Sequence, residues 1–163
     1  MSATFDPTAF SEMPFGEQLM LWSVRLWMRG TTNGTQDFAT LRNGFKLAGV
    51  PSAHTVLDGL MTVITTAATD PIDIRCPNCR DISDDEHLLI DVIAGLQHPG
   101  RGGATLFACR LPPAARRMGM DWAGELARTL AGAGLMLRPR EVFARAGAVR
   151  NGRPPGLKQA TFH

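Results

Sequence analysis

The chain has 163 residues, of which 44% are hydrophobic and 20% charged, and its formal net charge is +2. This length is enough for one domain with a sizeable core, and the balance of apolar and charged residues excludes a globally disordered protein. Three cysteines are an odd number in a chain of this size and do not indicate a framework of disulfides.

The N-terminus and the apolar runs favour a cytoplasmic protein. Residues 1–18 carry three acidic residues and no early basic region, which is not typical of a secretory signal. The strongest apolar run, residues 19–28, contains Arg25 and is much shorter than the roughly 20 residues of a membrane span. Basic charge is carried almost wholly by arginine, which hints at a GC-rich bacterial genome.

Apolar residues at helical spacing predict an all-α fold, a compact bundle of five to six short helices. We expect a helical domain over residues 1–137, which begins with a loose arm at 1–13, and a basic, largely flexible tail over residues 138–163. The helices are expected near residues 15–29, 36–47, 52–66, 84–97, 104–111 and 113–131.

The first predicted helix is apolar around most of its circumference. Such a helix lies either at the centre of a core or in a subunit interface. It carries Trp22 and Trp27, and two exposed tryptophans would be costly. We therefore expect a homodimer that forms through the Trp22/Trp27 helix.

The helix near residues 84–97 has a strong start signal. Ser83 and Glu86 have the spacing of a capping box, in which each side chain bonds the other residue's backbone amide. Asp84 and Asp85 also favour the positive end of the helix dipole. Directly before this start lies the one short motif of the chain with chemical content, Cys76-Pro-Asn-Cys79.

The two-residue spacer between Cys76 and Cys79 suits one half of a tetrahedral zinc site. The candidates for the other half are Cys109, His98, His87 and His54. The helix that carries Cys109 could fold back over the loop and His98 lies in the linker between them, which gives a site of Cys76, Cys79, His98 and Cys109. A second possibility is a four-thiolate site formed by two such loops across a dimer axis. The chain has no second CxxC, so the strong pattern of a zinc ribbon is missing.

Two other interpretations of the motif need no metal. A redox pair is expected at a helix N-terminus in a βαβ unit, whereas here four residues separate Cys79 from Asp84 and the βαβ pattern is missing. The leading interpretation is plainer: a turn that holds two half-buried thiols ahead of a well-capped helix.

Charge is distributed unevenly along the chain. Residues 1–91 carry a net charge of −6 and residues 92–163 carry +8. We favour neutralisation of one half by the other, although a basic segment also suits nucleic acid. Within the tail the candidate nucleic-acid-binding residues are Arg138, Arg140, Arg145, Arg150 and Arg153, and such binding would be weak and would fall steeply with salt.

These patterns favour a non-catalytic function, since no pairing of Ser, His, Asp or Cys has the spacing of a catalytic site. The preferred hypothesis is a bacterial regulatory or accessory protein that acts through protein–protein contacts, with zinc as a structural staple at the CxxC loop. The alternative is a nucleic-acid-associated regulator that uses the basic tail.

Overall fold

The computed structural model describes residues 9–100 and 103–139, and the prediction of an all-α fold is confirmed there. These residues form a short 3₁₀ helix and six α-helices and contain no strand. The elements are η1 (Phe10–Glu12), α1 (Phe15–Asn33), α2 (Thr35–Leu47), α3 (Ala53–Ala67), α4 (Asp84–Gln97), α5 (Thr105–Arg110) and α6 (Pro113–Gly132).

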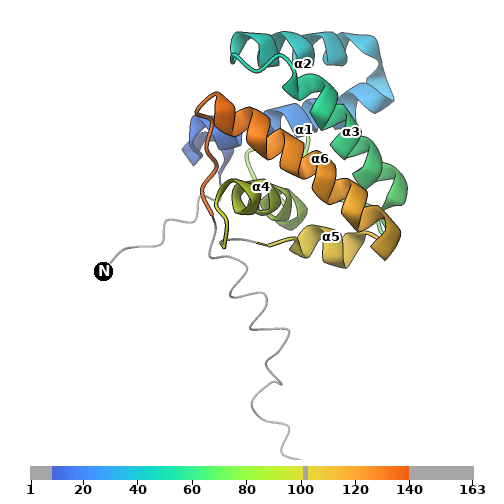
Figure 1. Ribbon diagram of the computed structural model, residues 1–163. Helices are drawn as coiled ribbons and strands as arrows, with labels where there is room; N and C mark the ends of the chain where they lie inside the picture. Colours follow the sequence, from blue (N-terminus) through green and yellow to red (C-terminus); the bar gives the residue numbers. More distant parts are fainter. Residues whose placement is uncertain (1–8, 101–102, 140–163) are drawn as a thin grey trace, which may run out of the picture.

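Helix α1 contacts three other helices of the bundle. It packs against α2, α3 and α4, while α6 packs along α3 and α4 and also touches α5. Figure 1 shows α2 at one end of the molecule and α5 at the other, with α3, α4 and α6 between them. Apolar residues cover most of α1 because neighbours surround it on several sides, and Leu21 and Val24 are completely buried.

Close contacts between tryptophan and glycine join the helices at one end of the bundle. A Cβ atom added to Gly44 of α2 would lie 2.5 Å from the ring of Trp22, and one added to Gly59 of α3 would lie 2.5 Å from the ring of Trp122. Each glycine therefore makes room for a flat ring against a helix backbone. Trp27 packs edge-on against Phe38, with 6.4 Å between the ring centroids.

These contacts bear on the dimer expected through the Trp22/Trp27 helix. Trp27 is 5% exposed and Trp22 is half-buried, so both rings find their packing partners inside one chain. Most apolar residues of α1 are buried within the chain. A homodimer through this helix stays a prediction.

Some boundaries differ from those expected. Helix α1 continues four residues past Arg29 and ends at Asn33. The next residue, Gly34, has a φ of 101°, a conformation that glycine adopts without strain. Residues 9–13, expected in a loose arm, pack on the domain: Met13 is buried, and the Phe10 amide donates to the Arg80 carbonyl at 2.9 Å.

The remainder of the expected arm, residues 1–8, and most of the expected tail, residues 140–163, lie outside the described residues. Among the helices of the described part, none has the length and apolar character to cross a membrane.

Candidate functional site

The connection between α3 and α4, residues 68–83, is the feature that stands out from the helical bundle; we refer to it as the clamped loop. It contains the Cys76-Pro-Asn-Cys79 motif, and its one bridge of strand type joins Asp81 to Ala9. Loops of this length without helix or strand are uncommon in compact domains, and those that are ordered usually have a function.

Arg25 of α1 holds the clamped loop from inside the protein. Its side chain is completely buried and donates to two loop carbonyls, from Nη1 to the Cys79 oxygen at 2.7 Å and from Nη2 to the Asp81 oxygen at 2.8 Å. The guanidinium also lies over the ring of Phe10, 5.5 Å from the centroid, in cation–π geometry. One arginine thus ties the loop, η1 and α1 together.

Glu86 of α4 neutralises this buried arginine. Arg25 Nε donates to Glu86 Oε1 at 2.7 Å and Nη2 donates to Oε2 at 2.9 Å, a bidentate pair with both side chains at 0% exposure. The same carboxylate accepts the backbone amides of Arg75 and Ser83, each at 3.0 Å. Ser83 Oγ in turn accepts the Glu86 amide at 3.1 Å, which confirms the predicted capping box.

A second group of hydrogen bonds fixes the loop on the N-terminal side of the cysteines. The Asp73 amide donates to Asp85 Oδ2 at 2.8 Å, and the Ser83 hydroxyl donates to the Asp73 carbonyl. Arg110 of α5 donates to the other carboxylate oxygen of Asp85 at 3.0 Å. The first turn of α4 therefore organises the loop as well as its own helix start.

The buried ion pair acts more by selecting one conformation of the loop than by adding to the stability of the fold. Removing two charges from water costs several kcal/mol per ion, roughly, and the attraction between them offsets this only when their remaining polar atoms are also bonded. Arg25 and Glu86 meet that condition through the loop backbone. Because moving the loop would leave a buried charge unsatisfied, the pair selects one loop path.

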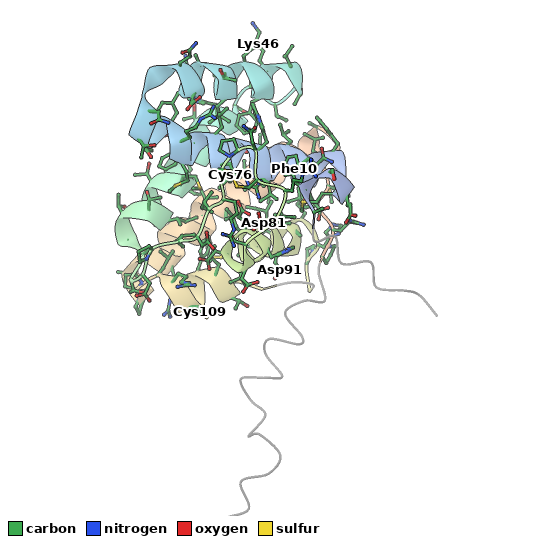
Figure 2. The ribbon with its side chains drawn as sticks, turned by 180° about the vertical axis from the view of Figure 1, so that it is seen from behind. Phe10, Lys46, Cys76, Asp81, Asp91 and Cys109 are labelled. Atoms are coloured by element: carbon green, nitrogen blue, oxygen red, sulfur yellow. A yellow bond between two sulfur atoms is a disulfide. The ribbon has the colours of Figure 1, made fainter. Side chains whose placement is uncertain are left out.

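The two cysteines of the motif form a disulfide, so the leading expectation of two separate thiols is wrong in this structure. The bond spans a sequence separation of only 3 residues, and the Cys79 amide donates to the Cys76 carbonyl at 3.1 Å across the same turn. Cys76 is exposed and Cys79 half-buried. Figure 2 shows Cys76 on the same side of the molecule as Phe10 and Asp81.

The four residues expected to hold zinc within one chain are not assembled. Cys109 lies exposed on α5, away from Cys76 in Figure 2, and the His98 ring bonds the Leu137 carbonyl at 3.0 Å. The part of the chain that the structure describes contains no group of three or more His, Cys, Asp or Glu side chains able to share a metal. The four-thiolate site, which needs Cys76 and Cys79 of a second chain, stays a prediction.

Among the arginines expected to bind nucleic acid, the described part contains Arg138 alone. Its Nη2 atom lies 3.3 Å from the buried carboxylate of Glu17 on α1, so this cation already has an internal partner. Arg140, Arg145, Arg150 and Arg153 lie outside the described residues. Nucleic-acid binding by the C-terminal segment stays a prediction.

Sequence reasoning missed Arg25 as the organising residue. The signal was present: an arginine stands in the middle of an otherwise apolar run, LMLWSVRLWM, where a cation has to find a buried partner. The pattern supplied no way to choose that partner, because Glu86 is 61 residues further along the chain.

A surface pocket of about 520 Å³ lies between α2 and α3, on a different part of the molecule. Its lining is mixed and consists of Gln36, Phe38, Ala39, Arg42, His54 and Asp58. Asp58 already accepts the indole N–H of Trp27 at 2.9 Å. This carboxylate therefore supports the packing of α1 on α3, and the clamped loop remains the stronger candidate site.

Comparisons of the chain with protein-family models, with curated proteins and with solved structures found no match.

Proposed function

We propose that the chain is a non-catalytic regulatory or accessory protein that binds another protein through the outer face of the clamped loop. One observation carries the proposal: a long loop is fixed from inside by a buried ion pair and yet directs charged side chains of both signs outward. Asp73, Arg75, Arg80 and Asp81 are all exposed, and Asn78 lies exposed at the turn between the cysteines.

Fixing the loop before binding supports recognition. A partner that meets a rigid surface does not lose the entropy of ordering it, and mixed charges at a rim select the partner and its orientation. The charges on the loop also restrain one another, since Arg75 lies 3.2 Å from Asp81 and 3.6 Å from Asp73. The outer face is therefore a patterned polar surface held in one shape.

A non-catalytic role is supported by how the buried polar groups are used. Each nitrogen of the Arg25 guanidinium donates to a protein acceptor, and both Glu86 oxygens accept from protein donors. Groups that bind or turn over a substrate keep polar atoms available for it. This pair directs them at the loop backbone instead.

The proposal includes zinc only as a site shared between two chains. Two reduced loops from two chains would supply four thiolates, from Cys76 and Cys79 of each, and would join the chains at the loop face. Metal analysis of untagged, reduced protein, with molar mass from light scattering, tests this form. We expect one zinc per two chains, lost in Cys76→Ser; equal zinc content in that variant would contradict it.

Site-specific photocrosslinking tests the binding surface. A benzophenone amino acid replaces Asn78 on the loop or, as the matched control, exposed Thr62 on α3, in the cells that produce the protein. We expect one dominant adduct from position 78, and its mass shows whether the partner is a second copy. The adduct should be lost on Arg80→Glu. An adduct that forms equally from position 62, or that survives Arg80→Glu, would contradict the proposal.

A further inference from the structure

We infer that Cys76 and Cys79 form a reversible thiol–disulfide exchange site for low-molecular-mass thiols, built into a loop that keeps its path when the bond opens. The inference rests on the bonded pair, the unequal exposure of the two cysteine residues and the independent anchoring of the loop on both sides. It does not depend on the proposed protein partner.

The chemistry follows from which sulfur can be reached. The thiolate of a small thiol attacks Cys76 Sγ, because Cys76 is exposed and Cys79 is half-buried. A bond forms between the incoming sulfur and Cys76, the Cys76–Cys79 bond breaks, and its electron pair leaves on Cys79. A second thiolate then attacks the incoming sulfur and releases Cys76. Overall, two small thiols are oxidised to one disulfide, and the protein gains two electrons and two protons.

The loop does not need the disulfide to keep its place. Ahead of the pair, the Asp73 and Arg75 amides bond carboxylates of α4, and after it the Arg80 carbonyl accepts the Phe10 amide. The ring that the bond closes is among the smallest possible, so opening it returns little entropy to the unfolded chain. The bond therefore stabilises the protein less than a disulfide that closes a long loop, and the loop is held without it.

The surroundings also indicate the type of redox site. The pair precedes the first residue of α4, Asp84, by several positions, outside the turn in which a helix N-terminus activates a cysteine. We therefore assign exchange at equilibrium with a thiol pool, and no rapid oxidoreductase turnover.

Redox titration in a Cys109→Ser background tests the inference, since that background leaves the pair as the sole thiols of the chain. The protein is equilibrated in mixtures of reduced and oxidised glutathione, quenched with acid, alkylated and weighed. We expect one reversible two-electron transition, an unchanged far-UV CD spectrum and a melting temperature about 4–8 °C lower in the reduced form.

Trapping variants in the same background show which cysteine forms the mixed disulfide with the small thiol. With oxidised glutathione, Cys79→Ser should form a mixed disulfide at Cys76 at least several-fold faster than Cys76→Ser forms one at Cys79. The inference is overturned if both thiols are alkylated in every mixture, or if reduction abolishes the helical CD signal. Equal trapping rates would overturn it as well.

Discussion

Two sets of contacts made by α1, from residues one helical turn apart, are held by different physics. Around α2 and α3 the contacts are apolar and depend on shape, with Trp22 seated on Gly44. Around the clamped loop the contacts are polar and depend on donors and acceptors, with Arg25 and Glu86 completely buried. A shape-based contact fails when volume is added, whereas a polar one fails when a partner is removed. The comparison therefore predicts opposite sensitivities along one helix.

Arg25→Met should have the largest effect. It removes the donors to the Cys79 and Asp81 carbonyls and leaves the Glu86 charge buried without its partner, which costs about 3–5 kcal/mol of unfolding free energy. Urea unfolding followed by far-UV CD measures the loss. Faster exchange of the loop amides should accompany it.

The double variant Arg25→Met, Glu86→Leu is the control. Removing both charges should recover part of the loss, because no carboxylate is then left uncompensated. The loop carbonyls still lack their donors, so amide exchange in the loop should stay fast. If the single variant lost no more than a surface substitution does, the difference between the polar and the apolar contacts of α1 would be refuted.

Gly44→Ala should have the next largest effect, at the apolar contact between α1 and α2. The new methyl group would overlap the ring of Trp22, and the flat ring has no flexible end that can move aside, so we expect a loss of about 1–3 kcal/mol. Thermal unfolding measures it. Gly132→Ala in α6 is the matched control: nothing lies within 4 Å of its added Cβ, and it should be neutral or stabilising by up to about 1 kcal/mol. Equal losses in the two variants would contradict the packing argument.

Ser83→Ala should have a smaller effect, among the polar contacts of the clamped loop. It removes the cap on the Glu86 amide and the hydrogen bond to the Asp73 carbonyl, for about 1–2 kcal/mol. Chemical denaturation gives the value. Ser83→Thr keeps a hydroxyl and should lose less; if it lost as much as Ser83→Ala, the effect would not come from the cap.

The smallest effect is expected where α1 meets α2, at a partly exposed ion pair. Arg29 donates two hydrogen bonds to Asp37, each at 2.8 Å, which lowers the pKa of the carboxyl below its ordinary value. A lowered folded-state pKa contributes stability above the unfolded pKa, and this contribution is lost as the pH falls through the folded value. In Arg29→Gln the Asp37 pKa should rise toward its ordinary value, as a carboxyl NMR titration would show. An unchanged titration would exclude the pair as the cause.

The sequence predicted the helices well and the loop poorly, for a physical reason. Helix α4 occupies the range expected from its capping box, and α6 begins at Pro113, a residue suited to the first helical turn. Both signals act within a few residues. The path of the clamped loop depends on Arg25, which lies more than 50 residues from its partners Cys79 and Asp81. The periodicity of apolar residues gives no information about contacts between residues so far apart.

The cysteine motif shows a second limit. The spacing of Cys76 and Cys79 is compatible with a metal, a disulfide or two thiols, and what distinguishes these outcomes is which groups come near in space. The expected helpers Cys109 and His98 are placed by α5 and by the end of α4, and neither joins the loop. Residue types alone do not show where Cys109 and His98 lie relative to the loop.

The distance along the chain between Arg25 and Glu86 also matters during synthesis. Glu86 is added 61 residues after Arg25, which at about 5–20 residues per second is roughly 3–12 seconds later. During that interval α1 carries a cation on a surface destined for the core, so the first half of the chain cannot close around it. We therefore expect α1 to be buried only after α4 has been made, because the ion pair that fixes the loop needs a residue from each of the two helices.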